Sequence, residues 1–205
     1  MGDARLPECL ACPDADDRYP CRRDDGTLDL ARVAQAIVQH GRLFYDLDGE
    51  LPDAEVTAPT DWVSYCEAEI VQQYPRLAFT LAIAAMDACD SVRDAAFVAA
   101  GVAEDLVVAH GPLIIDDIEK LAEHSAKFRY ILSGIWSQND SVHPDVWLRV
   151  AVAVSVGGVM SEGALCPRAG KGGKLLDEET ATALLEESVT EVAISLGIIE
   201  RALLS

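Results

Sequence analysis

Three cysteines near the N-terminus are the sharpest candidate for chemistry in this sequence. Cys9 and Cys12 stand three residues apart, and Cys21 follows them. Two thiolates at that spacing can bind one zinc ion, and Cys21 could supply a third ligand. No fourth ligand is evident, because the histidines are scattered singly and no second closely spaced cysteine pair follows. We therefore expect no cofactor, and a zinc site at Cys9, Cys12 and Cys21 is the less favoured alternative.

Other residues that could do chemistry lack the context that catalysis needs. Neighbouring acids such as Asp116 and Asp117 point about 100° apart on a helix, so they do not converge on one ion or substrate. The glycine- and lysine-rich stretch at residues 170–174 is followed by Leu175, where a phosphate-binding loop requires Ser or Thr. No serine lies in a Gly-x-Ser-x-Gly context. The expectation is that the protein is not an enzyme.

The C-terminal segment offers a candidate surface for a protein partner. Apolar residues recur there at helical spacing, which predicts one long helix over about residues 177–204. On the face opposite its main apolar stripe, Glu187 and Glu191 are followed by Ile194 and Ile198, so that face changes from acidic to apolar. Together with Glu186, these residues form the predicted partner-binding site. A neighbouring helix of the same chain could also cover the apolar end, as could a second copy in a homodimer.

The charge of the chain narrows the classes of partner. Its 205 residues include 35 acidic and 16 basic side chains, a formal net charge of −19. Such a surface repels nucleic-acid phosphates and anionic lipids, so direct binding of nucleic acid or membrane is disfavoured. A protein with a basic surface is the expected partner, although the charge could also serve solubility alone. The first residues do not resemble a secretory leader, and the most apolar stretches are shorter than the roughly 20 residues of a membrane helix, so we expect a cytoplasmic protein.

Periodicity and capping signals predict an all-α protein. Residues 1–26 form an irregular, cysteine-containing arm, and residues 27–205 form one helical domain. We expect a compact stack of antiparallel helix pairs with short connections and a glycine-rich loop at 163–174. Breaks are expected at Gly101 and at Gly111-Pro112. The predicted buried core comprises Phe79, Ile83, Met86, Phe97, Leu106, Ile118, Phe128, Leu132 and Trp147.

Three stretches within about residues 62–150 carry a resemblance. They are residues 74–78, residues 99–106 with His110 and Gly111, and residues 128–136. They resemble an uncharacterised family of small bacterial helical proteins, a domain of unknown function that reads AAGPLEDLL where this chain has AAGVAEDLV. The resemblance implies a right-handed stack of helix pairs and brings no catalytic residues. Glu104, Asp105 and His110 lie inside this motif, and helix capping and core packing explain them better than a site does.

Two classes of function compete. The favoured class is a non-enzymatic, acidic inhibitor that occludes another protein's functional surface, such as a bacterial immunity protein acting on its toxin. A phage-encoded inhibitor of a nucleic-acid-binding defence complex, of the DNA-mimic or anti-CRISPR type, fits the same physics, with carboxylates in place of phosphates. The second class is a small zinc-binding or catalytic domain built on the N-terminal cysteines.

Overall fold

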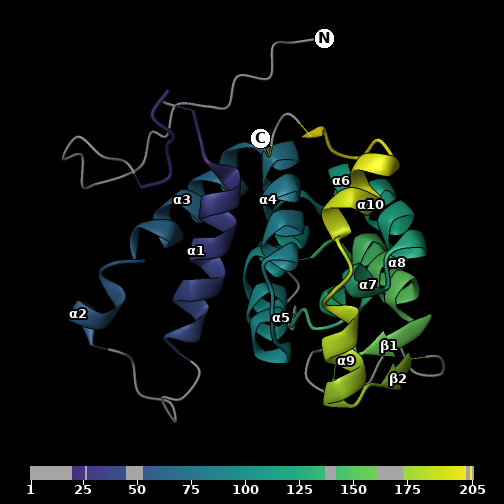
Figure 1. Ribbon diagram of the computed structural model, residues 1–205. Helices are drawn as coiled ribbons and strands as arrows, with labels where there is room; N and C mark the ends of the chain where they lie inside the picture. The colour runs from purple at the N-terminus through teal and green to yellow at the C-terminus, as the bar shows by residue number, and fades with distance from the viewer. Residues whose placement is uncertain are drawn as a thin grey trace.

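The computed structural model describes residues 20–25, 27–44, 53–136, 142–160, 173–201 and 204, and within them the protein is helical apart from two short strands. The expectation of an all-α fold is confirmed. The elements, shown in Figure 1, are α1 (Leu30–Arg42), α2 (Ala54–Thr57), α3 (Trp62–Gln73), α4 (Pro75–Asp87), α5 (Val92–Val98), the π-helical turn η1 (Ala99–Ala103), α6 (Glu104–His124), α7 (Ala126–Leu132), α8 (Pro144–Val154), β1 (Gly157–Val159), β2 (Gly173–Leu175), α9 (Glu178–Leu184) and α10 (Val189–Ser195).

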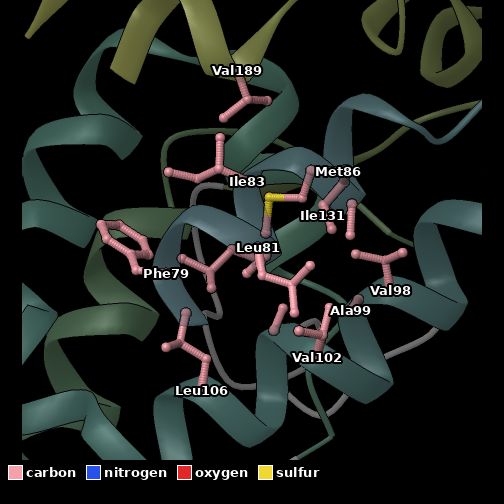
Figure 2. Close-up of a cluster of buried hydrophobic side chains, with 14 of the residues drawn as sticks. Phe79, Leu81, Ile83, Met86, Val98, Ala99, Val102, Leu106, Ile131 and Val189 are labelled. Atoms are coloured by element: carbon pink, nitrogen blue, oxygen red, sulfur yellow. The ribbon is translucent and has the colours of Figure 1, made fainter. Parts of the chain in front are cut away.

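Helix α4 lies at the centre of the molecule (Figure 1). Its sequence is apolar on nearly every side, which is the pattern of a helix covered all round. It packs against α1, α3, α6 and α10, and Phe79, Leu81, Ile83 and Met86 are fully buried in the cluster that Figure 2 shows. Seven of the nine predicted core residues are buried, and Phe97 and Trp147 are partly buried against the same cluster.

Several helix starts follow the signals in the sequence. Ser91 accepts a hydrogen bond from the backbone N–H of Asp94 at 3.2 Å, and the Asp94 carboxylate accepts one from the Ser91 N–H at 3.0 Å. This reciprocal pair satisfies two N–H groups that would otherwise lack partners at the start of α5. Ser125 caps α7 in the same way through the N–H of Phe128. Pro75 occupies the first turn of α4, where its missing N–H costs nothing.

The break predicted at Gly101 corresponds to a kink in the helical run, whereas the break predicted at Gly111-Pro112 is wrong. Between Val92 and His124 the helical run is kinked at Gly101, whose φ of −105° and ψ of −113° are non-helical, and it then continues through Pro112 inside α6. Gly111 allows α8 to pack closely on α6, because a Cβ at position 111 would lie 2.6 Å from the Val146 side chain of α8. By length and composition alone this run could cross a membrane, a test that core helices of soluble proteins also pass, and half of its apolar window is buried in the fold.

The single helix predicted over about residues 177–204 is also wrong. The segment forms two short helices, α9 and α10, joined through an extended Ser188. Ser188 caps α10, because its side chain accepts a hydrogen bond from the backbone N–H of Glu191. The Ser-x-x-Glu pattern starts a new helix here, although the spacing of apolar residues predicts one continuous helix. Gly197, at φ +68°, ends α10, with the N–H of Gly197 bonded to the carbonyl of Ile194 and the N–H of Ile198 bonded to that of Ala193.

A small parallel sheet follows α8. Strands β1 and β2 pair in the register Gly157 with Gly173, Gly158 with Lys174 and Val159 with Leu175. Most of the loop predicted at 163–174 lies outside the described residues, and its last residue belongs to β2. Val150, Val152 and Val154 alternate in the sequence as in a strand, but they lie in α8, which continues to Val154.

Candidate functional site

Helix α8 carries two apolar stripes, one buried and one exposed. The buried stripe consists of Val146, Val150 and Val154. The exposed stripe, which we call the α8 stripe, consists of Leu148, Val152 and Val156, which are 64%, 61% and 72% exposed. Leu148 and Val152 are four residues apart and share one side of α8, and Val156 follows in the bend after the helix, where it lines the same cavity as Val152. Isolated exposed apolar residues are ordinary, but an aligned set marks a surface that can bind.

The position of α8 is fixed by its contact with α6. Val146, near the start of α8, packs where Gly111 leaves room on α6. Further along both helices, Arg149 reaches Asp116 and Glu119. The contacts advance in the same direction on the two helices, so α6 and α8 lie parallel, and the α8 stripe is turned away from the core.

Arg149 organises the acidic border of this surface. Its guanidinium donates from Nε to Glu119 at 2.8 Å, and from Nη2 to Glu119 and to Asp116 at 2.5 Å each. These hydrogen bonds hold the pKa of Glu119 below its ordinary value, so the carboxylate stays ionised at neutral pH. One cation between two anions leaves the group with a net negative charge.

An open cavity of about 580 Å³ lies beside the α8 stripe. Its lining includes Val152, Val156, Glu119, Glu123 and Arg129. Arg129 is held in place because its guanidinium donates to the carbonyl oxygen of Ala122, at the end of α6. The surface thus combines an apolar centre with charged groups at its edge, the usual composition of a protein contact.

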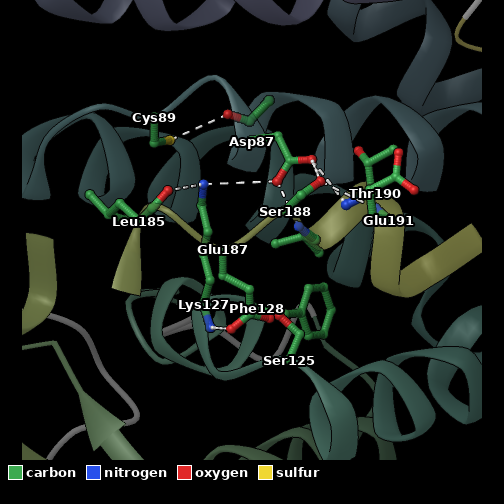
Figure 3. Close-up of polar contacts among 12 residues, drawn as sticks. Asp87, Cys89, Ser125, Lys127, Phe128, Leu185, Glu187, Ser188, Thr190 and Glu191 are labelled. Carbon is green, nitrogen blue, oxygen red and sulfur yellow. Dashed lines mark hydrogen bonds and ion pairs between the residues drawn. The ribbon is translucent and has the colours of Figure 1, made fainter. Parts of the chain in front are cut away.

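The predicted partner-binding residues of the C-terminal segment have roles inside the fold. Glu187 accepts from the backbone N–H of Ala126 at 3.2 Å and of Lys127 at 3.4 Å, so it covers the start of α7 (Figure 3). Glu191 forms an ion pair with Arg201 at 2.7 Å. Both carboxylates are therefore engaged by the chain itself.

The structure does not bring the five predicted residues onto one helical face. Glu186 and Glu187 precede α10 in the connection from α9, and Glu186 is exposed. Ile194 and Ile198 are partly buried against the core. Neighbouring helices of the same chain supply that cover, and partner binding at these residues stays a prediction.

A buried polar network that the sequence analysis did not find attaches α10 to α4 and α7. Asp87, at the end of α4, accepts from the backbone N–H groups of Val189 at 2.7 Å and Thr190 at 3.0 Å. Lys127 is 1% exposed, donates to the carbonyl of Leu185 at 2.8 Å and lies 3.8 Å from Asp87 (Figure 3). A buried ammonium needs such partners, so this network is structural.

The cysteines divide between two parts of the chain. Cys9 and Cys12 lie outside the described residues, and Cys21 is buried. Among the described residues, no group of three or more metal-binding side chains occurs. A zinc site at Cys9, Cys12 and Cys21 stays a prediction. Cys66 and Cys89 are buried, and burial raises the pKa of Cys89 to about 12, so that thiol stays protonated at neutral pH.

The residues of the resemblance motif hold the fold together. Glu104 accepts a hydrogen bond from the backbone N–H of Trp136. His110 bonds through Nε2 to the carbonyl oxygen of Val71 at 2.5 Å, which requires that this nitrogen carry the proton. These contacts agree with the interpretation of the motif as capping and packing.

The α8 stripe was missed although its signal is present in the sequence. Leu148, Val152 and Val156 recur at intervals of four, and so do the three buried valines of the same helix. The pattern shows that α8 is apolar on two sides. It does not show which side α6 covers, because that depends on the packing at Gly111.

Comparison with known proteins places the chain in a family. A family model described as a family of unknown function, DUF6869, matches residues 50–156, and the chain belongs to that family. The matched region runs from before α2 to the end of the α8 stripe. No curated protein and no solved structure matches the chain.

Proposed function

We propose that this protein is a non-enzymatic binding protein that docks a protein with a basic surface onto the α8 stripe. The observation that carries the proposal is the exposure of Leu148 and Val152 on one side of α8 and of Val156 just after the helix, next to an open cavity with an acidic border. Burying an apolar side chain of this size contributes roughly 1.5–3 kcal/mol, so three of them supply a usable contact centre.

Charge complementarity selects the partner. The chain carries a formal charge of −19, and Asp116, Glu119 and Glu123 lie on α6 beside the stripe. A partner with lysines and arginines around an apolar centre is attracted over a distance comparable to the screening length, about 8 Å at physiological salt. Arg129 donates to the Ala122 carbonyl and Arg149 to Asp116 and Glu119, so the net negative charge of the Arg149 group and the carboxylate of Glu123 are what attract the partner.

A second copy of the chain is a poorer occupant of the same surface. Two α8 stripes facing one another would bring two sets of border carboxylates together. Like charges placed opposite each other at an interface cost several kcal/mol. The proposal therefore commits to a different protein as partner, and self-association is one outcome of the test.

The mode of action that we propose is inhibition in the cytoplasm, in which docking covers the partner's own functional surface, as an immunity protein covers its toxin. The preformed helix pair α6 and α8 supports this mode, since a surface that is already ordered loses little conformational entropy on binding. An inhibitor of a nucleic-acid-binding complex would use the same carboxylates where phosphates otherwise bind.

The direct test uses a photo-crosslinking amino acid at Val152 in the native host. The matched control places the same amino acid at Val56, which is 51% exposed on α2, at the opposite side of the molecule in Figure 1. We expect a defined crosslinked protein from Val152 and not from Val56. That protein, once purified, should bind the wild-type chain, and Leu148→Ser should weaken binding about tenfold, equal to about 1.4 kcal/mol.

Three other outcomes would overturn the proposal. The crosslinked species could be a dimer of this chain, which ultracentrifugation would confirm. The purified partner could bind wild type and Leu148→Ser equally. Finally, residues outside the described part of the chain could cover the stripe, in which case Val152→Ser would lower the free energy of unfolding by more than about 1 kcal/mol; for an exposed site the change stays within about 0.5 kcal/mol.

A further inference from the structure

A second cavity, of about 220 Å³, lies between α1, α3 and α5. The cavity is lined by apolar side chains and by three polar ones, His40, Ser64 and Glu67. The apolar lining residues are Ile37, Phe44, Val63 and Phe97. The volume corresponds to the share of about seven water molecules at roughly 30 Å³ each. It is smaller than a drug-sized pocket of roughly 300–1,000 Å³, so only a small ligand fits.

Glu67 is the charged group of this cavity. Among the described residues it has no hydrogen bond and no ion pair. Burial, and after it the negative charge of Asp105, raise the pKa of Glu67 to about 7. No cationic side chain contributes to this shift. Above neutral pH the cavity therefore contains a desolvated carboxylate that a bound cation would stabilise.

His40 is a second polar group in the cavity wall. Its Nδ1 lies 2.9 Å from the hydroxyl oxygen of Thr60, and that hydroxyl is 3.2 Å from the carbonyl of Thr57. The Thr60 hydroxyl has one proton for these two contacts, so the donor and acceptor roles of the His40 ring nitrogens depend on its tautomer. Desolvation lowers the pKa of His40, and the nearby Asp61 carboxylate opposes this, so the ring is neutral above neutral pH.

Aromatic rings form the apolar part of the cavity. Phe44 stacks edge to face on His40, with ring centroids 5.1 Å apart. Phe97 lies directly against α1 at Gly41, where a Cβ would come within 2.5 Å of the ring. Flat rings beside a carboxylate favour an organic cation, because a cation interacts with both the charge and the ring faces.

We infer that the cavity between α1, α3 and α5 is a binding site for a small organic amine, with its ammonium group at Glu67 and an aromatic or compact alkyl body against Phe44 and Phe97. The site is separate from the α8 stripe. The inference is independent of the proposed partner function. The other titratable groups near Glu67 are the Asp105 carboxyl group of α6 and the imidazole of His40 on α1, which is neutral above neutral pH.

Benzylamine and benzyl alcohol are matched probes, because they share a ring and differ in charge. Titration of the ¹⁵N-labelled full chain at pH 8, followed by amide chemical shifts, should show saturable benzylamine binding that moves the signals of Ser64 and Phe97. Benzyl alcohol should bind about tenfold more weakly. Glu67→Gln should weaken benzylamine binding about tenfold and leave benzyl alcohol unchanged, whereas Glu69→Gln, on the same helix but outside the cavity lining, should change benzylamine binding less than twofold.

The pH dependence gives an independent measurement. Benzylamine should bind more tightly at pH 8 than at pH 6, because Glu67 is ionised only above its pKa of about 7. The inference is overturned if benzylamine and benzyl alcohol bind equally, if Glu67→Gln leaves benzylamine binding unchanged while its circular dichroism matches wild type, or if the shifts do not saturate at millimolar concentration.

Discussion

At the scale of single residues, folding strongly raises the pKa of Glu67. Its pKa is about 7 in the folded protein, against an ordinary value of 4.5. The protonated form is therefore favoured by folding, and that stabilising contribution is fully present below about pH 4.5 and is lost as the pH rises through about 7. Above that pH the ionised Glu67 destabilises the fold.

The first prediction follows for Glu67→Gln, which stays neutral at every pH. Its free energy of unfolding should exceed that of wild type by about 1–3 kcal/mol at pH 8, since one pKa unit corresponds to about 1.4 kcal/mol. The advantage should shrink at pH 5. Urea denaturation at both pH values measures it, and Glu69→Gln on the same helix controls for the loss of one negative charge. An equal advantage at both pH values would show that Glu67 is well solvated.

A second prediction concerns Asp87, which holds two N–H groups of α10 and lies beside the buried Lys127. Asp87→Ala should lower the free energy of unfolding by about 2–4 kcal/mol, because the helix cap is lost and a buried charge loses its counter-ion. The control is Asp177→Ala, which removes the exposed cap of α9 and should cost about 1 kcal/mol. Equal losses in urea denaturation would contradict the role assigned to Lys127.

At the scale of elements, the packing of α6 on α8 can be tested at one contact. Gly111→Ala should destabilise the protein, because the new Cβ would lie 2.6 Å from Val146, although alanine is favoured over glycine in a helix by about 1 kcal/mol. Val146→Ala creates the missing space. The double variant should therefore be more stable than the sum of the single losses predicts, with a coupling of about 0.5–3 kcal/mol. Additive losses would show that the two sites are independent.

Helix starts could be predicted from the sequence, whereas helix ends and faces could not. Ser91, Ser125 and Pro75 act on backbone groups within their own turn, so local pattern suffices. The break before α10 had a local signal in Ser188 and Glu191, but the apolar period across it suggested a continuous helix. Asp87 completes that break from about a hundred residues away in sequence, and no local pattern reveals such a contact.

The candidate binding sites likewise have features that local sequence shows and features that only the tertiary structure shows. The interval of four between Leu148, Val152 and Val156 could be recognised in the sequence, but their exposure is a consequence of where α6 packs. Glu67 and His40 lie on different helices, and neither stands in a recognisable motif. Their convergence on one cavity is a tertiary feature.

At the scale of the whole molecule, the net charge of −19 should govern how fast a basic partner arrives. We expect the association rate with the partner crosslinked at Val152 to fall steeply between low and physiological salt, while the dissociation rate changes little. Glu123→Lys should slow association, and Leu148→Ser should mainly speed dissociation. Stopped-flow or surface-based kinetics measure both rates. An association rate that ignores salt would mean that the charge serves solubility alone.

The π-helical turn Ala99–Ala103 constrains how this family can vary. Gly101 within it has φ −105° and ψ −113°, which are non-helical, so this segment is a kink that sets the rotation of α6 relative to α5. Removing one residue there would shift the helical register and rotate everything after it by about 100°, which would carry Leu106 and Ile118 out of the core. We expect an alignment of relatives to show substitutions but no single-residue gaps between residues 98 and 104. Selection on this segment would then act on its length more strictly than on its composition.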